Sequence, residues 1–69
     1  MIVLDCRGQR CPLPVIALAK RLPTIEVGEV VRVLADDPAA PNDIRAWCRM
    51  KDQEFVQEEG TAFDVRRIS

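Results

Sequence analysis

The chain has 69 residues, of which 48% are hydrophobic and 30% are charged, and its net charge at neutral pH is -1. A chain of this length builds one small core and its composition argues against disorder, so we expect a single domain over residues 1–69. The Lys and Arg residues are spread along the sequence, which argues against direct nucleic-acid binding. No apolar run approaches the ~20 residues that span a bilayer, and the amino-terminal residues do not resemble a signal peptide. We therefore expect a cytoplasmic protein that does not bind membranes.

The first half of the sequence predicts a strand, a helix and a second strand. Residues 2–4, IVL, form a short apolar run rich in β-branched side chains, which predicts a buried strand. Within residues 12–22 apolar side chains recur at helical spacing, and Pro23 ends the pattern, which predicts an amphipathic helix. Residues 30–34, VVRVL, follow Gly28 and predict the second strand.

The loop DDPAAP leads to a second predicted helix. We expect this helix to begin near Asn42 or Asp43, because polar and acidic side chains are favoured at helix amino termini. Its apolar residues at spacings of three and four share one face, which predicts that this face is buried. These apolar residues are Ile44, Trp47 and Cys48.

The last third of the sequence predicts a hairpin, with strands at 54–58 and 62–68 around Gly60. The expected order is therefore β-α-β-α-β-β. Two helices covering one face of a mixed four-stranded sheet give a two-layer α/β sandwich, and we expect the first two strands to be parallel through a right-handed connection.

The most reactive position that the sequence offers is Cys11, directly before Pro12 and Pro14. Proline is favoured in the first turn of a helix, which predicts that Cys11 is the N-cap residue. There the unpaired N–H groups and the helix dipole favour a thiolate, so we expect the pKa of Cys11 to be lowered. We expect Arg7 and Arg10 to add positive potential. Cysteine is a poor N-cap, so its presence here favours a chemical role.

The other polar candidates favour structural roles. Cys6 is either a loop residue or a thiol that pairs with Cys11 on oxidation, and Cys48 is expected to be a buried small hydrophobic residue. Asp36 and Asp37 are expected to form a turn or a helix cap. Three cysteines and no histidine are a poor ligand set for zinc, so we expect no metal. Without His or Tyr there is no usual base, which favours thiol, disulfide or persulfide exchange over acyl transfer.

The chain resembles the small sulfur-carrier proteins of the TusA type, also called SirA-like. The resemblance is carried by two stretches, LDCRGQRCPLPV and VLADDPAAPNDIRAWC, and by Gly28 between them. The mark of these proteins is a Cys-Pro-x-Pro motif, which becomes specific when LDxxG precedes it and DDPA follows it. The resemblance covers essentially the whole chain and implies the same β-α-β-α-β-β sandwich. The matching residues are Leu4, Asp5, Gly8, Cys11, Pro12, Pro14, Asp36, Asp37, Pro38, Asp43 and Ile44.

The resemblance also implies a function. It implies a sulfurtransferase that accepts sulfur as a persulfide on Cys11 from a cysteine desulfurase or a rhodanese-like donor, and passes it to an acceptor protein. The pathways it suggests are tRNA thiolation, molybdenum-cofactor assembly and sulfur oxidation, with no metal or organic cofactor. In the family, Pro12 and Pro14 belong to the motif that presents the sulfur, and Gly8 and Asp5 are expected to help present it. We expect partner binding to involve Arg7, Arg10, Asp36 and Asp37.

The chain also departs from the family pattern, and other functions stay open. Lys51-Asp52-Gln53 stands where many relatives have Gly-His, and Gln9 stands where leucine is frequent. One alternative is a non-catalytic regulatory or protein-binding module of the same fold, and another is redox sensing through a disulfide between Cys6 and Cys11. The absence of a long apolar edge strand favours a monomer or a weak dimer.

Overall fold

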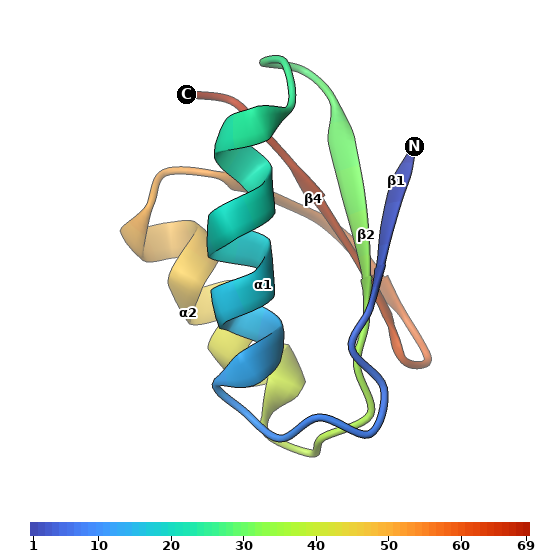
Figure 1. The fold of residues 1–69 in the computed structure, drawn as a ribbon. Coiled ribbons are helices and arrows are strands. Elements are labelled where there is room, and N and C mark those ends of the chain that lie inside the picture. The colour runs from blue at the N-terminus through green and yellow to red at the C-terminus, as the bar shows by residue number, and fades with distance from the viewer.

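Two helices lie side by side against one face of a four-stranded sheet in the computed structural model, which describes residues 1–69 (Figure 1). The predicted two-layer α/β sandwich is confirmed, with a short 3-10 turn added after the first helix. In chain order the elements are β1 (Ile2–Asp5), α1 (Leu13–Arg21), the 3-10 turn η1 (Leu22–Thr24), β2 (Val30–Leu34), α2 (Ala40–Met50), β3 (Glu54–Glu59) and β4 (Ala62–Arg66). Neither helix has the length and apolar composition that crossing a membrane requires.

The sheet has the strand order β1-β2-β4-β3 and is mixed, as predicted. Strands β1 and β2 are parallel, with Leu4 opposite Val33, whereas β4 is antiparallel to both β2 and β3. The pairing of β3 with β4 is irregular between Phe55 and Gln57. Because β1 and β2 are parallel, the loops that leave them both lie at one end of the sheet.

The core lies between the sheet and the helices and follows from the periodicity of the sequence. Alternate residues of the central strands point toward the helices, as the two-residue repeat of a strand requires. The strands contribute the fully buried side chains Val31, Val33, Phe63 and Val65. The helical layer contributes Leu18, Leu22, Ile44, Trp47 and Cys48.

The open face of the sheet carries a polar cluster at its centre. The carboxylate of Asp64 accepts hydrogen bonds from Arg32 Nε at 2.8 Å and Arg32 Nη2 at 3.0 Å. The Asp64 carboxylate accepts a third hydrogen bond from Gln57 Nε2 at 3.0 Å. Only 6% of the Asp64 side chain is exposed, against 37% for Arg32. Both helices pack against the other face of the sheet, so on this face the Arg32–Asp64 ion pair lies over the central strands instead.

Several element boundaries differ from the prediction, and β1 and β3 each end one residue later than predicted, at Asp5 and Glu59. Helix α2 begins at Ala40 rather than at Asn42 or Asp43, because the Asp37 carboxylate accepts the Ala39 N–H at 2.8 Å and so starts the turn earlier. Strand β4 ends at Arg66 rather than Ile68, since the N–H of Ile68 donates to the Gln53 side chain. Helix α1 covers 13–21 rather than 12–22.

Candidate functional site around Cys11

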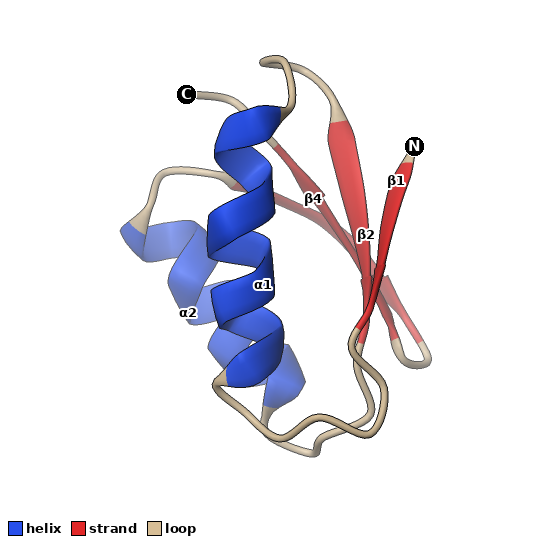
Figure 2. Cartoon of the chain, viewed as in Figure 1, coloured by secondary structure: helices blue, strands red, loops and turns tan.

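The loops β1–α1 and β2–α2 lie side by side at the end of the sheet where β1 and β2 finish (Figure 2). The N–H of Gly8 donates to Asp36 Oδ1 at 3.0 Å, which joins the two loops. Gly8 has a φ of 83°, a left-handed conformation that glycine adopts without strain. The predicted residues Gly8 and Asp36 thus meet, and together they fix the course of the loop that carries Cys11.

Cys11 stands one residue too early to be the N-cap of α1. The helix begins at Leu13 with Pro12 at the cap position, and no side chain caps it. The first helical hydrogen bond runs from Ile16 N–H to the Pro12 carbonyl, whereas the N–H of Leu13 donates to Arg10 in a preceding turn. The predicted N-cap position of Cys11 is therefore wrong.

The surroundings of the Cys11 sulfur favour the thiol over the thiolate. Burial of the sulfur, followed by the neighbouring carboxylate of Asp43 and the negative charge of Asp37, raises the pKa of Cys11 from 9.0 to about 11. Each of these effects disfavours a negative charge on sulfur. The expectation of a lowered pKa is wrong, because burial of the sulfur and the nearby carboxylates of Asp43 and Asp37 all disfavour the thiolate.

The nearby arginines do not change this result. Arg7 forms a bidentate pair with Asp5, with Nη2 to Oδ2 at 2.8 Å and Nε to Oδ1 at 2.9 Å. This pair lowers the pKa of Asp5 to about 2. We predicted that Arg7 adds positive potential at Cys11, but its guanidinium is paired with the carboxylate of Asp5. Arg10 is exposed and forms no ion pair.

The three cysteines are free, and only Cys11 is partly exposed. Cys6 and Cys48 are buried, with 3% and 2% of their surface exposed. Burial raises the pKa of Cys6, to which the charge of Asp5 adds, and burial raises the pKa of Cys48 to about 11. The predicted burial of Cys48 is confirmed. No three His, Cys, Asp or Glu side chains lie close enough to hold a metal ion.

A shallow, mostly apolar groove between α1 and α2 begins beside Cys11. Its lining residues are Pro12, Val15, Asp43, Ala46, Trp47 and Met50. Pro12 is the chain neighbour of Cys11, so one end of the groove lies next to the loop that carries the thiol. The position of Asp43 at the sulfur was not predicted, because nothing local in the sequence relates the first turn of α2 to the loop before α1.

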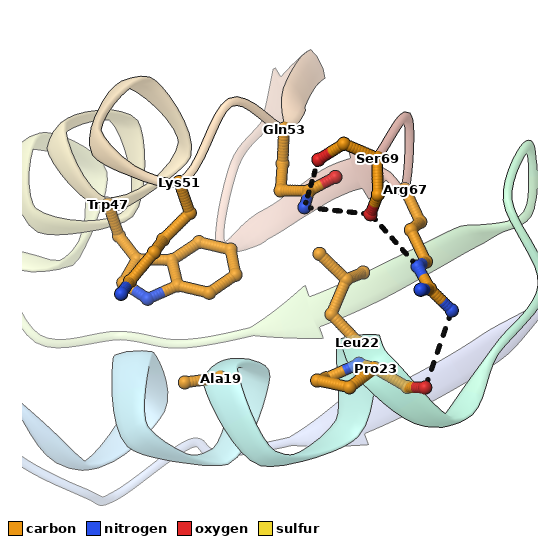
Figure 3. Close-up of a pocket in the computed structure, with 8 residues that line it drawn as sticks. All are labelled: Ala19, Leu22, Pro23, Trp47, Lys51, Gln53, Arg67 and Ser69. Carbon is orange, nitrogen blue, oxygen red and sulfur yellow. Dashed lines mark hydrogen bonds between the residues drawn. The ribbon is translucent and has the colours of Figure 1, made fainter.

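The largest cavity, with a volume of about 310 Å³, contains none of the predicted site residues. It lies between the carboxyl-terminal ends of α1 and α2, where the ring of Trp47 faces Leu22 and Pro23 (Figure 3). Two of its polar side chains bind the carboxyl-terminal residue: Gln53 and Arg67 both donate to the Ser69 carbonyl, at 3.4 and 3.1 Å. These bonds hold the last residues against the helices, which gives this region a structural role.

The family model described as "Sulfurtransferase TusA" matches residues 2–67. The chain belongs to the TusA family. A protein of Archaeoglobus fulgidus named "Putative sulfur carrier protein" is 45% identical over 65 residues, covering 94% of this chain and 84% of the relative. A second protein of that organism and name is 42% identical over 57 residues, covering 83% of this chain and 78% of the relative.

The fold agrees with a solved structure of a SirA-like protein. The crystal structure of the SirA-like protein from Desulfitobacterium hafniense matches with a TM-score of 0.72 and 31% identity, covering 94% of this chain and 92% of that chain. The resemblance stated from the sequence is therefore confirmed at the level of family and fold.

Proposed function

We propose that this chain is a sulfur carrier that holds sulfur as a persulfide on Cys11. Membership of the TusA family and relatives named as sulfur carriers support this role. The observation that carries the assignment to Cys11 is its exposure: it is the one partly exposed thiol, at the end of a groove, whereas Cys6 and Cys48 are buried.

The reaction moves one sulfur atom and needs no metal or organic cofactor. Cys11 Sγ attacks the outer sulfur of a donor persulfide, a new S–S bond forms, and the S–S bond of the donor breaks. The thiol proton ends on the donor sulfur, which leaves as a thiol. In the second step an acceptor cysteine attacks the outer sulfur on Cys11, and Cys11 returns to the thiol.

The surroundings of Cys11 suit the docking of partner proteins. Met50 lines the groove and is 71% exposed, and α1 exposes Leu13 and Ile16 on the same helical layer. Exposed apolar side chains at a groove are typical of protein interfaces. We propose a cysteine desulfurase or rhodanese-like donor, and acceptors in tRNA thiolation, molybdenum-cofactor assembly or sulfur oxidation. Of the charged residues predicted to bind these partners, Arg7 and Arg10 lie on the loop of Cys11, and Asp36 and Asp37 lie on the neighbouring β2–α2 loop.

Intact-mass spectrometry without reductant tests the proposal. The wild-type chain is incubated with a cysteine desulfurase and free cysteine, and in parallel with rhodanese and thiosulfate. We expect a gain of one sulfur that reductant removes, and its loss in Cys11→Ser. Cys6→Ser and Cys48→Ser are the matched controls and should still gain sulfur. If no chain gains sulfur from either donor, the protein-binding module becomes the better explanation.

A further inference from the structure

The side chain of Asp36 continues the pairing of β1 and β2 beyond the point where the two strands end. The N–H of Cys6, the first residue after β1, still donates to the Leu34 carbonyl at 2.7 Å, as in a parallel ladder. The next N–H in the same direction is that of Gly8, two residues later, and it donates to Asp36 Oδ1 at 3.0 Å instead of to a backbone carbonyl. The Asp36 carboxylate therefore takes the place of the next carbonyl of the ladder.

Two consecutive turns connect this hydrogen bond to the thiol. Residues 6–9 form the first turn, which a backbone hydrogen bond of 3.2 Å closes. Gly8 is the third residue of this turn, where its φ of 83° is the positive value that a type II turn requires. Residues 10–13 form the second turn, which contains Cys11 and leads into α1. The direction in which the first turn leaves β1 therefore sets where the sulfur lies.

No hydrogen bond from elsewhere in the chain holds the second turn. Leu34 and Asp36 are the only residues outside 5–13 that form hydrogen bonds with residues 6–11. Leu34 binds the residue before the bend, whereas Asp36 binds the middle of the first turn. The Asp36 carboxylate forms no ion pair, so its one hydrogen-bond partner is the backbone of the loop that carries the thiol.

We propose that Asp36 is a positioning residue, which holds the loop of Cys11 in the orientation that presents the sulfur to a partner protein. This inference rests on the proposed function of Cys11. It differs from the partner-binding role predicted for Asp36 from the sequence, because positioning needs the oxygen acceptor and not the negative charge.

Positioning matters most when both sulfur atoms are carried by proteins. Two docked proteins hold their reacting atoms in one relative geometry, and a misplacement of about 1 Å can lower such a rate about 100-fold. A small persulfide instead approaches the partly exposed Cys11 thiol from several directions, so its reaction depends little on the orientation of the loop. Loss of the Asp36 hydrogen bond should therefore affect the two kinds of donor differently.

The test compares a protein donor with a small-molecule donor. Sulfur loading of Cys11 is followed by rapid quenching and intact-mass spectrometry, with a cysteine desulfurase and free cysteine in one series and glutathione persulfide in the other. We expect Asp36→Ala to load at least about 10-fold more slowly than wild type from the desulfurase, and within about twofold of wild type from glutathione persulfide. If Asp36→Ala loads from the desulfurase as fast as wild type, or if both rates fall equally, the proposal is wrong.

Asp36→Asn separates the hydrogen bond from the charge. The amide oxygen of Asn still accepts the N–H of Gly8, but the side chain is neutral. We expect Asp36→Asn to load from the desulfurase at close to the wild-type rate. If it is as slow as Asp36→Ala, the partner protein recognises the negative charge, and the positioning role is overturned.

Glu29→Ala is the matched control for both the lost charge and the lost acceptor. Glu29 Oε1 accepts the N–H of Glu26 at 3.3 Å in the loop before β2, at the opposite end of the sheet from Cys11. The control variant loses the same charge and the same kind of hydrogen bond, so it should load like wild type from both donors. If it loads as slowly as Asp36→Ala from the desulfurase, the loss reflects general destabilisation, and the proposal fails.

Hydrogen exchange of the Gly8 amide, measured by NMR, keeps the proposal testable if Asp36→Ala folds poorly. This N–H should exchange slowly in wild type and in Asp36→Asn, because both retain the acceptor. Fast exchange in wild type would contradict the proposal. If wild type gains sulfur from neither donor, the proposed function fails and this inference fails with it. If wild type loads and only the effect of Asp36 is missing, the proposed function stands.

Discussion

Replacing Asp64 with Asn should destabilise the fold by removing the charge at the centre of the open sheet face. Asp64 accepts three hydrogen bonds, two of them from the Arg32 guanidinium. Breaking a buried ion pair costs about 3 to 5 kcal/mol. Arg32 is 37% exposed and regains part of its hydration, so we expect a loss of about 2 kcal/mol. In a domain of this size that corresponds to a decrease in Tm of roughly 8 to 16 °C.

Thermal unfolding followed by circular dichroism measures this loss and its pH dependence. The ion pair lowers the pKa of Asp64 below its ordinary value of 3.8, Arg32 being the largest cause. A carboxylate with a lowered pKa stabilises the fold above its unfolded-state pKa, and this contribution disappears as pH falls through its folded-state pKa. The difference in Tm between wild type and Asp64→Asn should therefore be full at neutral pH and should shrink below about pH 4.

The matched control removes an exposed pair on the same face of the sheet. Glu54 accepts a hydrogen bond from Arg66 at 2.8 Å, and the two side chains are 45% and 41% exposed. Exposed pairs contribute about 1 kcal/mol or less, so Glu54→Gln should melt close to wild type. If Asp64→Asn melts no lower than Glu54→Gln at neutral pH, or if its deficit persists unchanged in acid, the Asp64 ion pair does not stabilise this face.

Three more predictions concern the site and the helix termini. Cys11 should react with iodoacetamide at neutral pH about 100-fold more slowly than a thiol of pKa 9.0, because its pKa is about 11; a pH profile with its midpoint at or below 9.0 would contradict this. Asp37→Ala should cost about 1 kcal/mol in urea unfolding by removing the acceptor of the Ala39 N–H in the turn before α2, whereas Asp37→Asn should retain most of the stability; equal losses would refute a stabilising role for this turn. Asp52 has a φ of 55°, so Asp52→Gly should raise the free energy of unfolding by about 0.5 kcal/mol; a decrease in Tm would show that the left-handed residue is not strained.

The fold was largely predictable because its elements are encoded locally. The β-branched run VVRVL predicted β2 with its observed bounds, and the apolar stripe ending at Leu22 predicted α1 to within a residue at each end. Two boundaries were predicted wrongly because another hydrogen bond intervenes. The turn at Asp37 lets α2 begin earlier, at Ala40, and the distant Gln53 side chain binds the N–H of Ile68, so β4 ends before that residue. The strand order β1-β2-β4-β3 was not predicted, since strand periodicity indicates which face is buried but not which strands are neighbours.

The candidate site was only partly predictable. Cys11 was identified from its position before Pro12 and Pro14, and the predicted turn role of Asp37 agrees with its hydrogen bond from the Ala39 N–H. Asp36 instead joins two loops, because it accepts the N–H of Gly8. The acidity of the thiol was predicted with the wrong sign. Its pKa depends on burial and on Asp43, and both arise only when α2 packs beside the loop of Cys11.

The most direct test of a carrier role is to locate the transferred sulfur on one peptide of the wild-type chain. After incubation with a cysteine desulfurase and free cysteine, persulfides are blocked with iodoacetamide and the chain is digested with trypsin. Cleavage at Arg and Lys places Cys6, Cys11 and Cys48 on the separate peptides MIVLDCR, CPLPVIALAK and AWCR. We expect the extra sulfur on CPLPVIALAK alone. Sulfur found on either of the other peptides, with CPLPVIALAK unmodified, would contradict the assignment of the carrier thiol to Cys11.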